Sequence, residues 1–76
     1  MPDRITFDKN VLGGKPVIRG LRISVELLLG LMAQGAGADE ILEDYPDLEA
    51  ADLHAALDYA RALVAGERVF DREPAG

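Results

Sequence analysis

The chain has no cysteine, and His54 is the single histidine among its 76 residues. Without cysteine, neither a disulfide framework nor thiol chemistry is available. A zinc site built from histidine and cysteine is excluded as well, because one histidine cannot supply its ligands. A chain of this length forms one domain whose core is only marginally stable on its own. We therefore expect a single domain that self-associates.

Long apolar stretches are also absent. No segment approaches the roughly 18 apolar residues that predict a transmembrane helix. The first six residues, Met1 to Thr6, lack the apolar core of a signal peptide. The expected location is therefore the cytoplasm, with no membrane partner.

Positive charge is scarce and unevenly placed in a chain whose net charge is −6. Residues 1–23 contain five basic and two acidic side chains, a net of +3, whereas residues 24–76 contain three basic and twelve acidic ones, a net of −9. A split of this kind indicates two surfaces with two kinds of partner.

The pattern of residues 13–24 is the most informative in the chain. Glycines on both sides of Val17 and Ile18 permit tight turns, so this pair is predicted to form a short extended segment. Pro16 restricts the segment to an edge or to the start of a strand. Ser24 directly precedes a long apolar run and is the predicted N-cap of a helix.

Residues 5–7 alternate in a way that predicts a first strand. Two strands as short as this one and the segment at 17–18 are marginal as an isolated sheet. A second copy of the chain is therefore the simplest pairing partner.

Three helices are expected after residue 24, over residues 25–34, 38–45 and about 49–65. Pro46 ends the second helix, because the residue before proline is pushed out of the helical region. Gly66 ends the third. Two residues, Glu49 and Asp47, are candidates for the N-cap of the third helix. Its predicted core positions are Leu53, Ala56, Leu57, Ala60, Leu63 and Val64, with Asp52, Asp58 and Arg61 on the opposite face.

The first helix has an apolar stripe that is wider than one core needs. Leu27 and Leu31 lie beside the main stripe, so the helix is either central to the domain or partly a dimer face. Together with Val17 and Ile18, these two leucines are the candidate dimerisation residues.

The domain is expected to span residues 1–66, followed by a charged tail over 67–76. Val69 and Phe70 are the apolar pair in that tail, and we consider them candidate partner-binding residues. An apolar anchor among charges can order on a partner protein. The alternative is that the pair folds back onto Leu63 or the strand region.

Two motifs in the chain resemble a known family. Residues 5–8 together with Gly13-Gly-Lys-Pro-Val-Ile-Arg-Gly-Leu-Arg-Ile23, followed by residues 35–57 with Glu40-Ile-Leu-Glu-Asp-Tyr-Pro46, resemble the small bacterial domain of unknown function 433 over residues 5–60. The resemblance implies a helix-turn-helix-like, antitoxin-type protein of the kind often encoded beside a PIN-like nuclease.

Lys15, Arg19 and Arg22 are the candidate DNA-binding residues, because they carry much of the basic charge of the N-terminal part. Ordinary surface charge is the alternative interpretation. The third helix is a poor recognition helix, since its early exposed positions would include Glu49 and Asp52, and acids repel phosphates.

Catalysis has little support in the sequence. His54 and Asp58 are four residues apart and can share a helix face, but such a pair is far more often solvated surface than an acid/base couple. The dense carboxylates between residues 39 and 52 are typical of helix starts and of solubility charges rather than of a metal site. We expect no enzyme activity, no metal and no cofactor.

The predicted fold is a mainly α domain, in which a short N-terminal β segment or hairpin precedes three helices in a homeodomain-like helix-turn-helix bundle. The leading functional hypothesis is an antitoxin-type component of a bacterial toxin-antitoxin module. It would act as a homodimer that binds a PIN-like nuclease and, as an open question, operator DNA. The alternative is a small non-catalytic interaction or adaptor domain without DNA binding.

Overall fold

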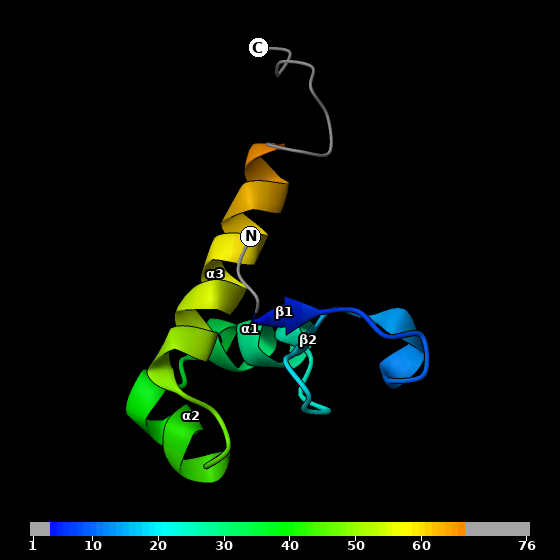
Figure 1. Cartoon of the computed structure of the whole chain (residues 1–76). Helices are drawn as coiled ribbons and strands as arrows, with labels where there is room; N and C mark the ends of the chain where they lie inside the picture. Colours follow the sequence, from blue (N-terminus) through cyan, green and yellow to red (C-terminus); the bar gives the residue numbers. More distant parts are fainter. Residues whose placement is uncertain (1–3, 67–76) are drawn as a thin grey trace.

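The computed structural model describes residues 4–66, which form a two-stranded hairpin followed by three helices (Figure 1). This architecture confirms the predicted mainly α domain with an N-terminal hairpin. The elements in chain order are β1 (Ile5–Thr6), a single 3-10 turn η1 (Leu12–Gly14), β2 (Val17–Ile18), α1 (Val25–Ala33), α2 (Ala38–Asp44) and α3 (Ala50–Ala65).

The strands β1 and β2 pair with each other in antiparallel fashion, with Ile5 opposite Ile18. Each strand therefore has a pairing partner within one chain, so this hairpin does not depend on a second copy for its pairing. The other edge of β2 is also covered, because Val17 forms a bridge with Ser24 and the Ile18 N–H donates to the Ile23 carbonyl at 2.9 Å. The ribbon is stable at this length because it packs on the helices, with Ile5 and Ile18 both in the core.

Helix α1 begins where the sequence predicts. Ser24 is its N-cap, and the Ser24 Oγ accepts a hydrogen bond from the Leu27 N–H at 2.9 Å. The helix ends at Ala33, one residue earlier than expected, with Gln34 as the C-cap and Gly35 following at a φ of +102°. That left-handed conformation suits glycine and stops the helix.

Helices α2 and α3 also follow their predicted boundaries closely. Gly37 caps α2 without a side-chain hydrogen bond, and the helix ends just before Tyr45 and Pro46. Glu49, rather than Asp47, is the N-cap of α3. Gly66 closes α3 in the left-handed conformation, at a φ of +71°.

The core lies where the hairpin, α1 and the first half of α3 meet, and α2 closes it from one end. Its apolar members come from both strands, from the three helices α1, α2 and α3, and from the turn before α3. The buried cluster consists of Ile5, Ile18, Val25, Leu28, Ile41, Leu48, Leu53, Ala55 and Ala56.

Three predicted core positions of α3 are instead exposed. Leu57 is 47% exposed, Leu63 is 46% exposed and Val64 is 89% exposed. The length of α3 explains Leu63 and Val64, because the C-terminal end of this helix projects beyond α1 and the hairpin (Figure 1). Helical periodicity identifies the apolar face of a helix, but it does not tell how far the neighbouring elements extend along that face.

Candidate functional site

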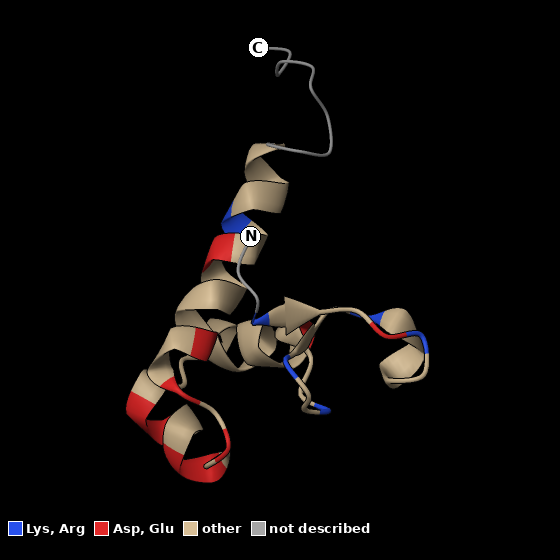
Figure 2. Cartoon of the chain, viewed as in Figure 1, with Lys and Arg blue, Asp and Glu red and all other residues tan. Residues whose placement is uncertain are grey.

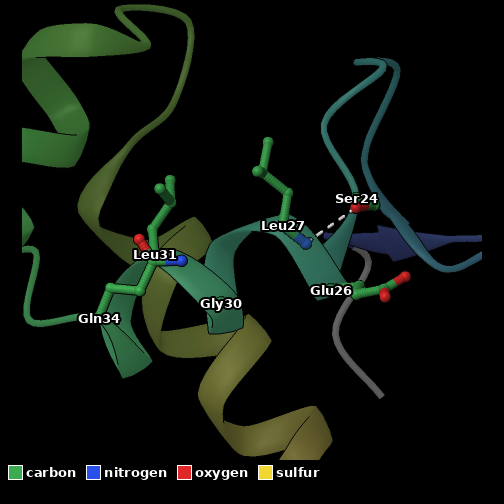
Figure 3. A pocket seen from close by; sticks show the side chains of 6 residues that line it. All are labelled: Ser24, Glu26, Leu27, Gly30, Leu31 and Gln34. Atoms are coloured by element: carbon green, nitrogen blue, oxygen red, sulfur yellow. Dashed lines mark hydrogen bonds between the residues drawn. The ribbon is translucent and has the colours of Figure 1, made fainter.

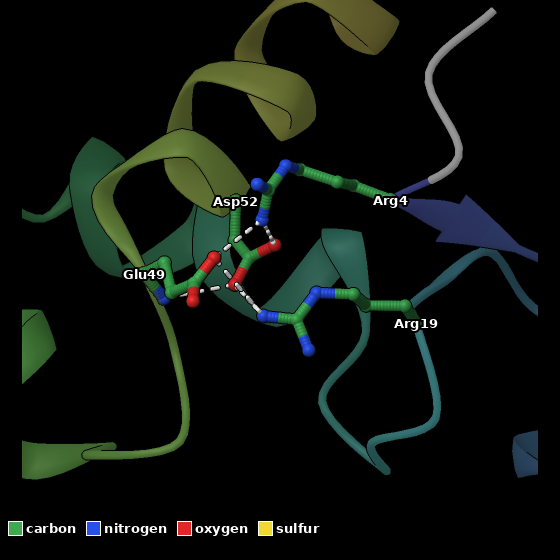
Figure 4. Close-up of polar contacts among 4 residues, drawn as sticks. All are labelled: Arg4, Arg19, Glu49 and Asp52. Carbon is green, nitrogen blue, oxygen red and sulfur yellow. Dashed lines mark hydrogen bonds and ion pairs between the residues drawn. The ribbon is translucent and has the colours of Figure 1, made fainter.

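The best-ordered polar arrangement is centred on Asp52, in the first turn of α3 (Figure 4). Its side chain is completely buried. Arg4 donates to Asp52 Oδ1 at 2.9 Å, Arg19 donates to Oδ2 at 3.0 Å, and the Glu49 N–H donates to Oδ2 at 2.8 Å. Arg4 also donates to Glu49 Oε1 at 2.8 Å. We call these four residues the Asp52 cluster.

The Asp52 cluster fastens the hairpin to α3. Arg4 directly precedes β1 and Arg19 directly follows β2, so one guanidinium from each strand reaches the same carboxylate. A buried carboxylate without partners would be costly, and here every buried polar side-chain atom of residues 4–66 has a hydrogen-bond partner. The arrangement joins both ends of the hairpin to the first turn of α3 through ion pairs and hydrogen bonds.

Within the Asp52 cluster, the pKa of the carboxylate Asp52 is lowered and the pKa of the guanidinium of Arg4 is raised. Burial acts to raise the pKa of Asp52, but the Glu49 N–H, the Arg4 hydrogen bond and the charges of Arg19 and Arg4 together hold it below its usual value. The pKa of Arg4 is raised, first by its hydrogen bond to Glu49 and then by that to Asp52. Both shifts favour the charged forms, as expected for an ion cluster that contributes to stability.

The prediction that Asp52 lies on the exposed face of α3 is wrong. The hairpin covers the first turn of this helix. The side of α3 that carries Asp52 is therefore buried as well, although the sequence places it opposite the apolar face. One sequence signal was available, since Glu49 and Asp52 have the N-cap to N3 spacing in which an acidic side chain bonds the cap N–H.

The three candidate DNA-binding cations are held in different ways. Arg19 belongs to the Asp52 cluster and is 38% exposed. Lys15 forms an exposed ion pair with Glu26 of α1 at 3.0 Å. Arg22 is exposed and makes no ion pair within residues 4–66. The structure therefore leaves only Arg22 of the three without an acidic partner.

The dimerisation candidates divide into buried and exposed pairs. Val17 and Ile18 are 2% and 0% exposed within one chain, so they offer no surface to a partner, contrary to the sequence-based expectation. Leu27 is 39% exposed and Leu31 is half-buried. Figure 3 shows both leucines extending from the same side of α1, beside a shallow hollow that includes Gly30. The partner-binding candidates Val69 and Phe70 lie outside the described residues.

His54 and Asp58 lie on the solvated surface of α3, which is the interpretation the sequence favours over an acid/base couple. His54 is exposed, and Asp58 pairs with Arg61 at 3.0 Å. Residues 4–66 contain no group of three metal-ligating side chains. In the same part of the chain, no helix combines the length and apolar character needed to cross a membrane.

The acidic and basic side chains gather at different places on the molecule (Figure 2). No lysine or arginine occurs between Arg22 and Arg61 in the sequence. Acids concentrate on α2 and on the segment leading into α3, whereas the basic residues lie mostly on the hairpin. The exposed carboxylates of α2 are Asp39, Glu40, Glu43 and Asp44.

The positions of these carboxylates along α2 show which of them stabilise the helix and which do not. Asp39 and Glu40 stand in the first turn, where negative charge stabilises a helix. Glu43 and Asp44 stand in the last turn, which contains no basic residue, and there negative charge is unfavourable. The stability of α2 explains the first two acids but not the last two.

The fold is a small, mainly helical domain with a two-stranded N-terminal hairpin, and comparison with known proteins agrees with it. The family model described as "Protein of unknown function (DUF433)" matches residues 5–60. The chain therefore belongs to the DUF433 family.

Two relatives support this assignment. An uncharacterized protein from Sinorhizobium fredii is 36% identical over 74 residues, which cover 95% of this chain and 34% of that protein. The crystal structure of a DUF433 member protein from Anabaena variabilis matches with a TM-score of 0.73 and 38% identity, covering 87% of this chain and 63% of that one. The chain thus spans about a third of the length of the first relative and under two thirds of the second.

Proposed function

We propose that this protein is a non-enzymatic, antitoxin-type binding domain that acts as a homodimer in the cytoplasm. In this proposal the acidic end of the molecule, formed by α2, docks on the basic surface of a PIN-like nuclease. The supporting observation is that the four exposed carboxylates of α2 make no ion pair within residues 4–66. Enzymes that handle nucleic acid carry positive surfaces, and complementary charge directs association.

The two carboxylates in the last turn of α2 give this proposal its strongest support. Glu43 and Asp44 oppose the helix dipole and have no intramolecular partner among the described residues, so folding does not account for them. A partner that presents lysine or arginine side chains does account for them.

DNA binding is the secondary part of the proposal. Helices α2 and α3, joined by the turn at 45–49, have the outline of a helix-turn-helix. The early exposed positions of α3 are Ala50, Ala51 and His54, next to the acid Glu49, and none of them is a lysine or arginine that would pair with phosphates. Any operator contact is therefore assigned to the hairpin cations, and we expect it to be weak and salt-sensitive.

A second candidate is an adaptor that binds protein but no DNA. It is favoured by the pairing of Arg19 with Asp52 and of Lys15 with Glu26, which satisfies two of the three candidate cations within the molecule. In this case the acidic surface of α2 has the same role, and only the operator contact is missing.

The test begins with the reading frame adjacent to the gene, which the proposal expects to encode a PIN-like nuclease. Co-expression of the full chain should relieve growth inhibition by that nuclease and yield a co-purifying complex. The double variant Glu43→Lys/Asp44→Lys should lose both effects while remaining folded, because lysine suits a helix C-terminus. The matched control, Asp58→Lys on the exposed face of α3, should retain them. A wild-type chain that neither binds nor neutralises the nuclease would refute the proposal.

A further inference from the structure

We propose that two copies of this chain associate through α1, with the two helices crossing at Gly30. This inference rests on the homodimer of the proposed function and names the surface that forms it. It replaces Val17 and Ile18, which are buried within one chain, with a surface that the folded protein exposes.

Gly30 is the first observation. It lies in the interior of the nine-residue helix α1, where glycine is the poorest helix former after proline. A Cβ added at this position would meet no atom within 4 Å. Neither an intramolecular contact nor a left-handed backbone requires glycine here, since Gly30 is absent from the positive-φ residues. A missing side chain on an open helix face allows another backbone to approach closely.

The apolar surface around Gly30 is the second observation. On one side of the glycine, Leu27 and Leu31 border the shallow hollow seen in Figure 3. On the other side, a more apolar hollow of about 460 Å³ lies between α1 and α3. Its principal lining residues are Leu29, Gly30 and Ala33 of α1 with Tyr59, Ala60 and Leu63 of α3. Gly30 therefore lies between two depressions, one in which Leu27 and Leu31 alternate with polar side chains and one that is mainly apolar.

Charge favours a second copy as the occupant. The chain carries a net charge of −6, so two copies repel each other except where carboxylates are few or paired. Glu26 is the only charged residue of α1, and Lys15 of the same chain pairs with it at 3.0 Å. Helix α1 is thus the nearly neutral face of an acidic protein.

The sequence of α1 is also self-complementary about Gly30. In an antiparallel crossing, residues that precede Gly30 in one copy lie against residues that follow Gly30 in the other. Glu26 and Leu27 then face Ala33 and Gln34 of the second copy, so that large side chains meet a small one and the carboxylate is near an amide donor. The same contacts recur on the other side of the two-fold axis.

The area that a dimer needs determines how far the interface extends. A stable interface buries about 800 Å² per partner, and a nine-residue helix about 14 Å long covers only part of that. The hollow between α1 and α3 continues the apolar surface to Leu63, which is 46% exposed. The interface is therefore expected to include the projecting half of α3.

The experiment compares three variants of the full chain by analytical ultracentrifugation over a range of micromolar concentrations. The wild type should be a dimer. Gly30→Glu should be a monomer, with helical circular dichroism retained, because its side chain enters open space in the single chain. Ala51→Glu is the matched control, since it adds the same charge at an exposed position of α3 and should remain a dimer.

Gly30→Ala separates the interface from helix propensity. If glycine has no role, alanine should raise the thermal midpoint and leave the dimer unchanged. The proposal expects the dimer dissociation constant to rise at least tenfold even though the helix itself is improved. A monomeric wild type, a dimeric Gly30→Glu protein, or equal dissociation of Gly30→Glu and Ala51→Glu would overturn it. Nuclease binding by Gly30→Glu is measured separately, so a failure of this inference can be distinguished from a failure of the proposed function.

Discussion

The hairpin end and the α2 end of this small domain use charge in opposite ways. At the hairpin end, Arg4 and Arg19 meet the buried carboxylate of Asp52, and each ion is held by at least one partner of opposite sign. At the other end, the carboxylates of α2 are exposed and have no ion pair within residues 4–66. The contrast teaches that net charge alone is a poor guide to function, because ions that hold the fold must be separated from those available to a partner.

The largest expected loss of stability comes from removing the ion pairs that join the hairpin to α3. Asp52→Ala removes the common partner of Arg4 and Arg19 and should lower the free energy of unfolding by about 3 kcal/mol. This value lies at the lower end of the usual range because both arginine side chains are more than a third exposed, at 34% and 38%, and solvent screens their charges. The thermal midpoint should fall by about 12 °C or more, as measured by circular dichroism at matched concentrations.

Asp58→Ala is the control for that measurement. Asp58 pairs with Arg61 on the exposed surface of α3, so its loss should change the free energy of unfolding by less than about 0.5 kcal/mol. If the two alanine variants were equally stable, the Asp52 cluster would not hold the hairpin in place.

Acid should weaken the same end without any mutation. The pKa of Asp52 is lower in the folded protein than in the unfolded chain, so its stabilising contribution is complete above the unfolded value of about 4 and is lost as the pH falls below it. Unfolding by urea should show stability declining below about pH 4. The Asp52→Ala variant should decline less steeply over that range, and an identical slope in the two proteins would contradict this account.

The smallest change in the free energy of unfolding is expected at the α2 end, where removing charge should stabilise the protein. Glu43→Gln/Asp44→Asn removes two charges that oppose the helix dipole, and should raise the free energy of unfolding by a few tenths to about 1 kcal/mol. Asp39→Asn/Glu40→Gln, at the other end of the same helix, should lower it by a similar amount. Both differences can be measured by chemical unfolding. If the first pair proved destabilising, Glu43 and Asp44 would have a structural role in the single chain.

Local signals predicted much of this fold. The Ser24 cap, the breaks at Pro46 and Gly66 and the three helices were all readable, because capping and backbone restriction act within a few residues. The first turns of α3 also bury Leu53 and Ala56, as its periodicity indicates.

Contacts between distant residues were not readable. Arg19 and Asp52 are separated by 33 positions, and no periodicity in either segment marks them as partners. The burial of Asp52 and the pairing of Arg19 both follow from the hairpin lying over the first turn of α3. The exposed Leu63 and Val64 reflect the same difficulty, since only the assembled structure shows where the neighbours of α3 end.

The fastening of the hairpin to α3 has a consequence for the growing chain on the ribosome. Arg4 is made before Asp52, which follows 48 positions later. At a synthesis rate of about 5–20 residues per second, the arginine waits roughly 2–10 seconds for its carboxylate. During that interval the two short strands lack the helix that supports them, and a ribbon of this size is marginal alone. The hairpin therefore acquires its full stability only after the first turn of α3 has been made.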